Sequence, residues 1–206
     1  MQKSAVKFSP GNPLDPWLSS QRLFPPYDWA EVFGRSAPVE IDLGAGDGVY
    51  AEARAKREPG TNFVAVERLL GRAKKIAKKA VRNDLVNLKV LRIESWYFIK
   101  NLCAPESLAA ITLRYPDPWP KRRHQGNRIL NRNFAEDAAR AVARGGLLKL
   151  TTDASEYFEW ACREMADSVS WIPDSSWTGE REPTSEFEEL FAKEGRELYR
   201  RAWRKA

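Results

Sequence analysis

VEIDLGAGDG, residues 39–48, is the stretch that decides the fold of this chain. It opens with the short apolar segment VEIDL and continues into glycines at alternate positions, Gly44, Gly46 and Gly48. Residues 49–56 follow with the pattern of a helix. Glycine permits a tight turn and lets a ligand approach the backbone. The stretch therefore predicts a buried strand that turns, next to a ligand, into a helix; the alternative is the same turn with no ligand.

Strands and helices are expected to alternate along the rest of the chain. This alternation predicts an α/β fold with a mostly parallel, doubly wound sheet and helices on both faces. Apolar runs predict strands at residues 62–67, 88–93, 108–115 and 147–152, and helical patterns cover residues 69–85, 96–101, 133–143 and 155–167.

Acidic residues follow the five predicted strands. In a parallel sheet the carboxyl ends of the strands share one edge, and ligands bind beyond that edge. A single acid there is most often a helix cap or a solvated loop residue, but five at one edge predict a site. These acids are Asp42, Glu67, Glu94, Asp117 and Asp153.

The length of 206 residues fits a single domain, and 43% hydrophobic with 30% charged residues is typical of globular proteins. Residues 1–37 are rich in proline and aromatic residues and are expected to form an irregular arm. Residues 38–206 are expected to form one domain. The chain has no apolar run of about 18 residues and no signal-peptide core at its start, so we expect a cytoplasmic protein without membrane attachment.

The chain contains one histidine and two cysteines, which restricts its chemistry. Catalysis by a Ser-His-Asp or Cys-His group is disfavoured, and we expect no metal site. Cys103 and Cys162 are expected to be reduced, buried thiols. Any reaction must therefore depend on carboxylates and a cofactor. The net charge of +6 suggests a polyanionic partner.

The glycine spacing and the next acids favour a nucleoside cofactor. Val49 stands where the dinucleotide fingerprint requires glycine, which disfavours an NAD enzyme. Glu67 comes 19 residues after Gly48 and can accept hydrogen bonds from ribose hydroxyls. Glu94, with Ser95 beside it, suits adenine. Trp96 fits either an adenine contact or ordinary core.

The loop YPDPWPKRRH, residues 115–124, carries the most specific motif. It resembles the phenylalanine-proline-aspartate-proline-tryptophan-x-lysine signature of bacterial tRNA (guanine-N7-)methyltransferases, with Tyr115 in place of the phenylalanine. The resemblance extends in order from Glu40 to about Trp203. It implies a Rossmann-like class I methyltransferase fold with an antiparallel C-terminal strand, S-adenosyl-L-methionine as cofactor and tRNA as substrate. It also implies methylation at N7 of a variable-loop guanosine by a monomer or homodimer.

The resemblance also implies roles for individual residues. Asp117 matches the catalytic aspartate, and SEFE, residues 185–188, resembles a C-terminal threonine-x-aromatic-glutamate motif whose hydroxyl is either Thr184 or Ser185. A helix cap by either hydroxyl would have the same sequence. The implied cofactor-binding residues are Glu40, Asp42, Gly44, Gly46, Gly48, Glu67, Glu94, Ser95 and Asp117. The implied substrate-binding residues are Lys121, Asp153, Thr184, Ser185 and Glu188.

The proposed reaction suits a fixed carboxylate. N7 of guanine has a free lone pair and no proton, so methyl transfer to it requires no general base. The guanine becomes positively charged, and a carboxylate held beside it stabilises that charge. We therefore interpret Asp117 as a residue that orients and stabilises the base, on a loop stiffened by prolines.

Two basic segments are candidates for RNA contact. The expected RNA-contacting residues are Lys121, Arg122, Arg123, His124 and Arg128, although uncharged residues 125–127 interrupt this run. The basic segment at residues 72–82 is either an RNA footprint or a solvated helix face. Two other functions remain open: methylation of another RNA base or an exocyclic amine, and non-catalytic RNA binding.

Overall fold

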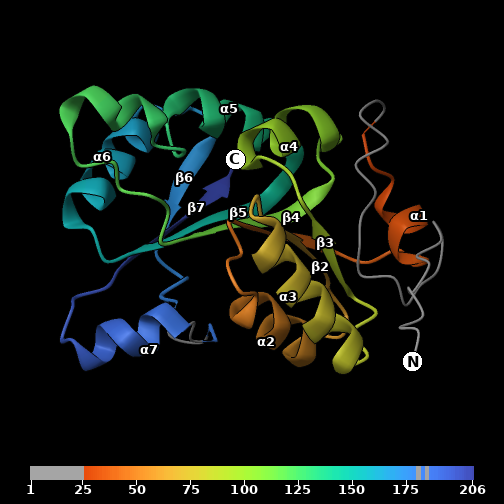
Figure 1. Ribbon diagram of the computed structural model, residues 1–206. Coiled ribbons are helices and arrows are strands. Elements are labelled where there is room, and N and C mark those ends of the chain that lie inside the picture. The colour runs from red at the N-terminus through yellow and green to blue at the C-terminus, as the bar shows by residue number, and fades with distance from the viewer. Residues whose placement is uncertain (1–25, 180–181, 184–185) are drawn as a thin grey trace.

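The computed structural model describes residues 26–179, 182–183 and 186–206. Seven strands of this part form one sheet in the order β3-β2-β1-β4-β5-β7-β6 (Figure 1). Strands β1 to β5 are parallel, whereas β7 is antiparallel to both β5 and β6. The strands are β1 Val39–Leu43, β2 Asn62–Val66, β3 Leu88–Leu91, β4 Leu108–Arg114, β5 Val142–Thr152, β6 Trp171–Asp174 and β7 Tyr199–Lys205.

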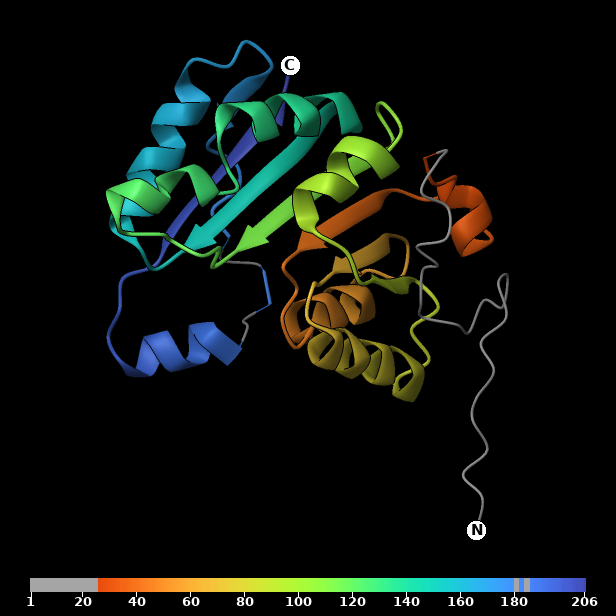
Figure 2. The same cartoon turned by 45° about the horizontal axis from the view of Figure 1, so that its top comes forward.

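Helices cover both faces of the sheet. Figure 2 shows α4, α5 and α6 on one face and α2, α3 and α7 on the other. The predicted doubly wound fold and its antiparallel C-terminal strand are therefore confirmed. The helices are α1 Trp29–Phe33, α2 Val49–Arg57, α3 Leu70–Arg82, α4 Ser95–Leu102, α5 Arg132–Ala141, α6 Ser155–Ala166 and α7 Glu186–Lys193, with a short 3-10 helix, η1, at Arg122–Asn127.

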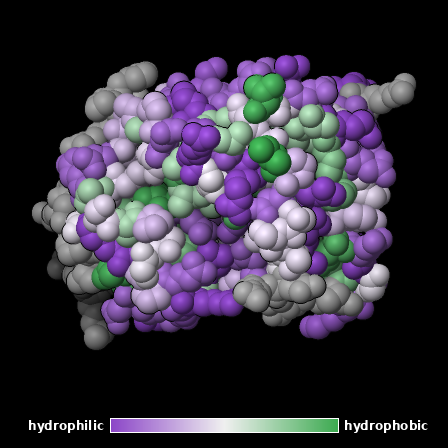
Figure 3. Space-filling model, turned by 180° about the vertical axis from the view of Figure 1, so that it is seen from behind, coloured by the Kyte–Doolittle hydropathy of each residue, from purple (hydrophilic) through white to green (hydrophobic). Residues whose placement is uncertain are grey.

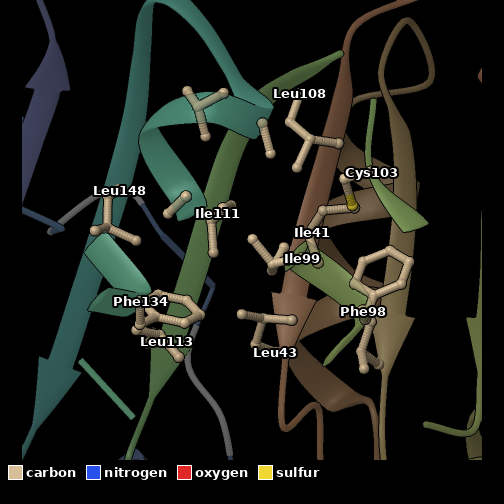
Figure 4. Close-up of a cluster of buried hydrophobic side chains, with 14 of the residues drawn as sticks. Ile41, Leu43, Phe98, Ile99, Cys103, Leu108, Ile111, Leu113, Phe134 and Leu148 are labelled. Carbon is tan, nitrogen blue, oxygen red and sulfur yellow. The ribbon is translucent and has the colours of Figure 1, made fainter. Parts of the chain in front are cut away.

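The larger core lies between the sheet and helices α4, α5 and α6 (Figure 4). The central strands are buried on both faces, which explains why they read as continuous apolar runs in the sequence. Alternate residues of these strands meet helix side chains across this interface. The cluster in Figure 4 includes Ile41, Leu43, Ile111, Leu113 and Leu148 from the strands and Phe98, Ile99 and Phe134 from the helices.

Strand β5 starts earlier than the sequence predicts. The helix expected over residues 133–143 ends at Ala141, and β5 begins at Val142 and contains both Gly145 and Gly146. Val142 pairs with Leu108 of β4 and Leu147 pairs with Ala110, so the register shifts here and residues 143–146 of β5 lie opposite the single residue Ala109. A Cβ atom on Gly146 would lie 2.5 Å from Cγ1 of Val142, 2.7 Å from the carbonyl oxygen of Ala109 and 2.9 Å from that of Ala143, so both β4 and the local backbone require glycine at this position.

The segment before the sheet is only partly irregular. Residues 1–25 of the predicted arm lie outside the described residues. Asp28 caps the short helix α1 by accepting hydrogen bonds from the backbone N–H groups of Ala30 and Glu31. Tyr27 and Trp29 are buried against Phe98 of α4. The expectation of an irregular segment was therefore wrong at α1, where five residues form a helix.

None of the helices in the described part of the chain is long and apolar enough to cross a bilayer. Seen from behind, hydrophobic residues form small separate patches among hydrophilic ones (Figure 3).

The turn between β1 and α2 depends on Gly48. Its φ is +75°, and an added Cβ would lie 2.6 Å from Cγ1 of Ile76 in α3. We expect Gly48→Ala to lower the free energy of unfolding by about 2–4 kcal/mol, because it combines a left-handed backbone with overpacking. Urea denaturation measures this change. The matched control is Gly71→Ala, whose Cβ meets no atom within 4 Å; an equal loss in the control would contradict the argument.

Candidate active site

A cavity of about 640 Å³ opens at the carboxyl ends of the parallel strands. The strand order reverses here, because the chain runs outward from β1 to β3 and then returns to β4 on the other side of β1. Ligands of open α/β sheets bind at such a reversal, and the volume suits a small organic ligand. Predicted site residues from four consecutive strand ends line this strand-edge cavity: Gly44, Glu67, Glu94, Ser95 and Asp117.

The glycine loop is held in place by Glu67. Gly44, Gly46 and Gly48 all have positive φ values, between 59° and 75°. One carboxylate oxygen of Glu67 accepts a hydrogen bond from the N–H of Gly46 at 3.0 Å, and the other accepts from the N–H of Leu69 at 2.7 Å. Glu67 is buried at the cavity wall. It therefore fixes the loop and faces the ligand space at the same time.

Glu94 and its neighbours form the wall after β3. The carboxylate of Glu94 caps α4 by accepting hydrogen bonds from the N–H groups of Trp96 and Tyr97, at 2.9 and 2.6 Å. Trp96 lines the cavity but is anchored outside it, because its indole N–H donates to Asp137 at 2.7 Å. Its ring also packs edge-on against Phe134. Glu94 is therefore both a helix cap and part of the cavity wall. Trp96 is likewise both packed against core residues and part of that wall.

Asp117 lies on a bent loop at residues 115–120, here called the Asp117 loop. The backbone is left-handed at Tyr115 and at Trp119, with φ values of 48° and 41°. Such values are uncommon for residues other than glycine and concentrate at functional sites. The carboxylate of Asp117 is exposed and borders the cavity, between the two bends. The loop therefore presents a charged group to the cavity on a constrained backbone.

Arg128 is placed differently from the expectation that it contacts RNA. It is 2% exposed and lies beneath the Asp117 loop. Its guanidinium donates to the carbonyl oxygen of Pro118 at 2.8 Å and to that of Trp119 at 3.4 Å. It also pairs with Glu156 at 2.9 Å and lies 5.1 Å from the ring centre of Trp160. Prolines supply no N–H donors, so the loop carbonyls need a donor from elsewhere, and Arg128 provides it.

Glu40 does not reach the cavity, although it was expected to bind the cofactor. Its carboxylate pairs with Arg54 at 2.9 Å and with Lys149 at 3.4 Å. Glu182 joins the same buried network through both cations and through the hydroxyl of Tyr50. Burial opposes the ionisation of Glu182, but Lys149 and Arg54 hold its pKa at about 2. The network ties a distant segment of the chain to the sheet. No short motif in the sequence indicated it.

Asp42 is buried under the glycine loop. Burial raises the pKa of Asp42 to about 7, and the positive charge of Arg114 only partly opposes this effect. Its Oδ2 atom has no hydrogen-bond partner within the described part of the chain. Asp42 does not line the cavity itself, although Leu43 and Gly44, which follow it in the chain, do.

We expect Asp42→Asn to stabilise the protein more at pH 8 than at pH 5. The folded pKa lies near 7 and the ordinary value is 3.8, so the folded state resists losing this proton, and stability falls as pH rises from about 4 to 7. Asparagine removes that dependence, which makes the gain in unfolding free energy larger at pH 8 than at pH 5 by about 3 kcal/mol. Urea denaturation at the two pH values measures it. Equal gains at both pH values would contradict the buried, protonated state.

Glu188 is connected to the cavity through Arg114. Arg114 lines the cavity, pairs with Glu188 and lies 4.3 Å from the ring centre of Tyr50. Arg200 binds the other oxygen of Glu188 at 3.1 Å. The sequence interpretation missed Arg114, although it directly precedes the Asp117 loop. Thr184 and Ser185 lie outside the described residues, so the choice between them stays open.

The remaining predicted residues lie around the cavity rather than in its wall. Asp153 pairs with Arg196 at 2.9 Å. Lys121 and Arg123 are exposed, and the imidazole of His124 packs edge-on against Trp119 with 5.8 Å between ring centres. Gly126 and Asn127, from the uncharged interruption, line the cavity. Of the predicted basic residues at this loop, Lys121 and Arg123 are therefore the exposed cations in the described side chains.

Comparisons with known proteins identify the family. A family model described as "Putative methyltransferase" matches residues 36–201. The chain is 35% identical over 141 residues to the tRNA (guanine-N(7)-)-methyltransferase of Geobacter metallireducens, covering 68% of this chain and 67% of that protein. It is 30% identical over 174 residues to the enzyme of the same name from Chlamydia caviae, covering 83% and 78%. This chain belongs to the tRNA (guanine-N(7)-)-methyltransferase family.

The tRNA (guanine-N(7)-)-methyltransferases that match differ in length. The protein from Thermotoga maritima is 28% identical over 179 residues, which cover 87% of this chain but 54% of that protein. The chain therefore spans about half the length of this relative.

Solved structures support the fold. The 16S rRNA methyltransferase KamB superposes with a TM-score of 0.62 at 16% identity, covering 87% of this chain and 94% of that chain. A 30S ribosomal A1408 methyltransferase from an uncultured bacterium superposes with a TM-score of 0.55 at 15% identity, covering 86% and 92%. Likeness at this level of identity shows a shared methyltransferase fold.

Proposed function

We propose that this protein transfers a methyl group from S-adenosyl-L-methionine to N7 of a guanosine in the variable loop of tRNA. The names of its relatives support the substrate, and residues 38–206 are proposed as the domain responsible. The observation that carries the proposal is the exposed carboxylate of Asp117, held between two left-handed residues at the edge of the cavity.

The cavity suits the proposed cofactor. Glu67 has two carboxylate oxygens, each of which accepts one backbone hydrogen bond and can accept a further one from a ribose hydroxyl. Glu94 and Ser95 offer polar groups for adenine on the adjoining wall. The turn at Gly44 leaves the backbone open to the ligand, since no Cβ occupies that space. S-adenosyl-L-methionine, when bound, supplies a methyl group on a positively charged sulfur.

Asp117 would act on the guanine through its charge. N7 has no proton to remove, so the reaction needs correct placement of the base and stabilisation of the positive charge that it gains. A carboxylate on a constrained loop meets both needs, because little reorganisation is required as the charge develops. The same carboxylate can accept hydrogen bonds from the N1 and N2 donors of guanine, which favours this base. Asp117 is therefore proposed to orient and stabilise the guanine rather than to accept a proton.

The position of methylation can be tested by strand scission. Unmodified tRNA is incubated with the protein and S-adenosyl-L-methionine, reduced with borohydride and treated with aniline. Methylation at N7 makes the RNA labile to this treatment, so a cut at one guanosine of the variable loop is expected. Methyl incorporation without a cut would support the exocyclic amine instead, and tRNA binding without incorporation would support a non-catalytic binding protein.

The affinities for tRNA and for S-adenosyl-L-methionine should depend differently on salt concentration. We expect the affinity for tRNA to fall steeply between about 50 and 200 mM salt, because phosphate contacts release counterions. The affinity for S-adenosyl-L-methionine should change little over this range. Titrations of each ligand at several salt concentrations measure the two slopes. Equal slopes would contradict an RNA site built from cations.

A further inference from the structure

Among the described side chains, which do not include that of Arg122, the loop side of the cavity presents few exposed cations to RNA. Lys121 and Arg123 are exposed there, but residues 125–127 are uncharged. Arg128 is buried and committed to the carbonyls of the Asp117 loop. Exposed cations on a second element at the same cavity would therefore add to the charge available to a bound tRNA.

Helix α3 begins at the opposite side of the same cavity. Leu69 and Arg72, at its start, line the cavity together with Arg68. The helix contains no acidic residue. Its apolar stripe, which includes Ala73 and Ile76, is buried against the sheet, so its basic residues face outward. The exposed cations of the helix are Arg72, Lys74, Lys75, Lys78 and Arg82.

Several of these cations have no acidic partner among the residues that the structure describes. Lys75 pairs with Asp47 at 3.0 Å, and Arg82 lies 3.9 Å from Glu52. We call Arg68, Arg72, Lys74 and Lys78 the α3 surface. None of these four cations forms an ion pair with a described residue. Lys74 and Lys78 are one turn apart, and like charges at that spacing destabilise a helix slightly. Unneutralised charge at the mouth of a cavity favours an anionic partner.

We propose that the α3 surface binds the sugar-phosphate backbone of the tRNA beside the target nucleotide. The inference rests on the proposed function. It adds the α3 surface to the RNA-contacting residues expected beside the Asp117 loop. The backbone would cross the cavity mouth from Lys121 and Arg123 to Arg68 and Arg72, and then follow α3. At 1.5 Å per residue, Arg72 to Lys78 extends about 9 Å along the helix axis, enough to contact more than one phosphate. These contacts position the RNA but do not select its sequence.

The test compares two double variants of the full chain. Lys74→Gln with Lys78→Gln removes two charges from the α3 surface and keeps good helix formers. The matched control, Lys100→Gln with Arg144→Gln, removes two exposed charges from α4 and β5, outside the cavity wall. The dissociation constant for unmodified tRNA is measured at several salt concentrations, and kcat and KM are measured with saturating cofactor.

The α3 variant should bind tRNA about tenfold more weakly and lower the slope of log affinity against log salt by about 1.5. Its KM for tRNA should rise while kcat stays within about twofold, since uniform binding is lost. The control should keep both the affinity and the slope. Equal losses of tRNA affinity in both variants, or no loss in the α3 variant, would overturn this inference. The proposed function would still be supported if the unaltered protein methylates tRNA. If the unaltered protein neither binds nor methylates tRNA, both proposals fail.

Discussion

Asp117→Asn is expected to lower kcat for tRNA methylation by about 100- to 1000-fold, the loss seen when one charge-stabilising group is removed from an active site. Asparagine keeps the size of the side chain, so the loop should change little, and its carbonyl oxygen can still accept one of the two guanine hydrogen bonds. The phosphate contacts, which supply most of the affinity for tRNA, are not altered. The substitution removes the negative charge next to the guanine, which becomes positively charged during the reaction. The dissociation constants for tRNA and cofactor should stay within about threefold.

Single-turnover methylation with saturating cofactor measures this effect separately from binding. The matched control is Asp167→Asn, which makes the same change at the exposed end of α6 and should keep full activity. A kcat within about threefold of the unaltered protein for Asp117→Asn would show that the charge of Asp117 has no part in the reaction. Loss of tRNA binding in place of kcat would assign it to substrate binding alone.

The second large effect is expected at Arg128, which holds the Asp117 loop from beneath. Arg128→Met leaves the carbonyls of Pro118 and Trp119 without their donor and Glu156 without its cation. Because Glu156 is largely exposed, the main cost comes from the two loop carbonyls that lose their donor, about 2–3 kcal/mol of unfolding free energy. Arg128→Lys keeps the charge but not the fork that reaches two carbonyls, so it should cost about 1–2 kcal/mol.

The positioning role can be separated from stability by kinetics on Arg128→Lys at a temperature where it is fully folded. We expect kcat to fall at least tenfold with a nearly unchanged KM for tRNA, because a displaced carboxylate stabilises the charge less well. In the Asp117→Asn background the same substitution should have little further effect on kcat, since the two residues act as one unit. Additive losses of kcat, or full activity of Arg128→Lys alone, would contradict the positioning role.

The fold was predictable because its signals are local. The apolar run before Gly44 and the glycines after it define a strand and a turn within ten residues, and a helix follows directly. Repetition of that unit then predicts a parallel sheet and places its ligand edge. Gly44, Glu67 and Asp117 meet at the cavity for this reason.

The features that the sequence did not reveal depend on contacts between distant segments. Gly146 follows a helical pattern in the sequence, but it belongs to β5, which pairs with β4 on both sides of this position. Arg128 follows a basic run and looks like part of an RNA surface, yet two loop carbonyls and Glu156 draw it into the interior. Glu40 looks like a site acid at the glycine loop, but it meets cations from α2 and β5. None of these partners is adjacent in the chain.

The central claim is the transfer of a methyl group to guanine N7 of tRNA, and identification of the modified nucleoside tests it most directly. The protein is incubated with methyl-labelled S-adenosyl-L-methionine and unmodified total tRNA, and the RNA is digested to nucleosides and separated by chromatography with mass detection. The account predicts that the label is found in 7-methylguanosine and is lost with Asp117→Asn. Label in a nucleoside methylated on an exocyclic amine, or no label in tRNA at all, would contradict it.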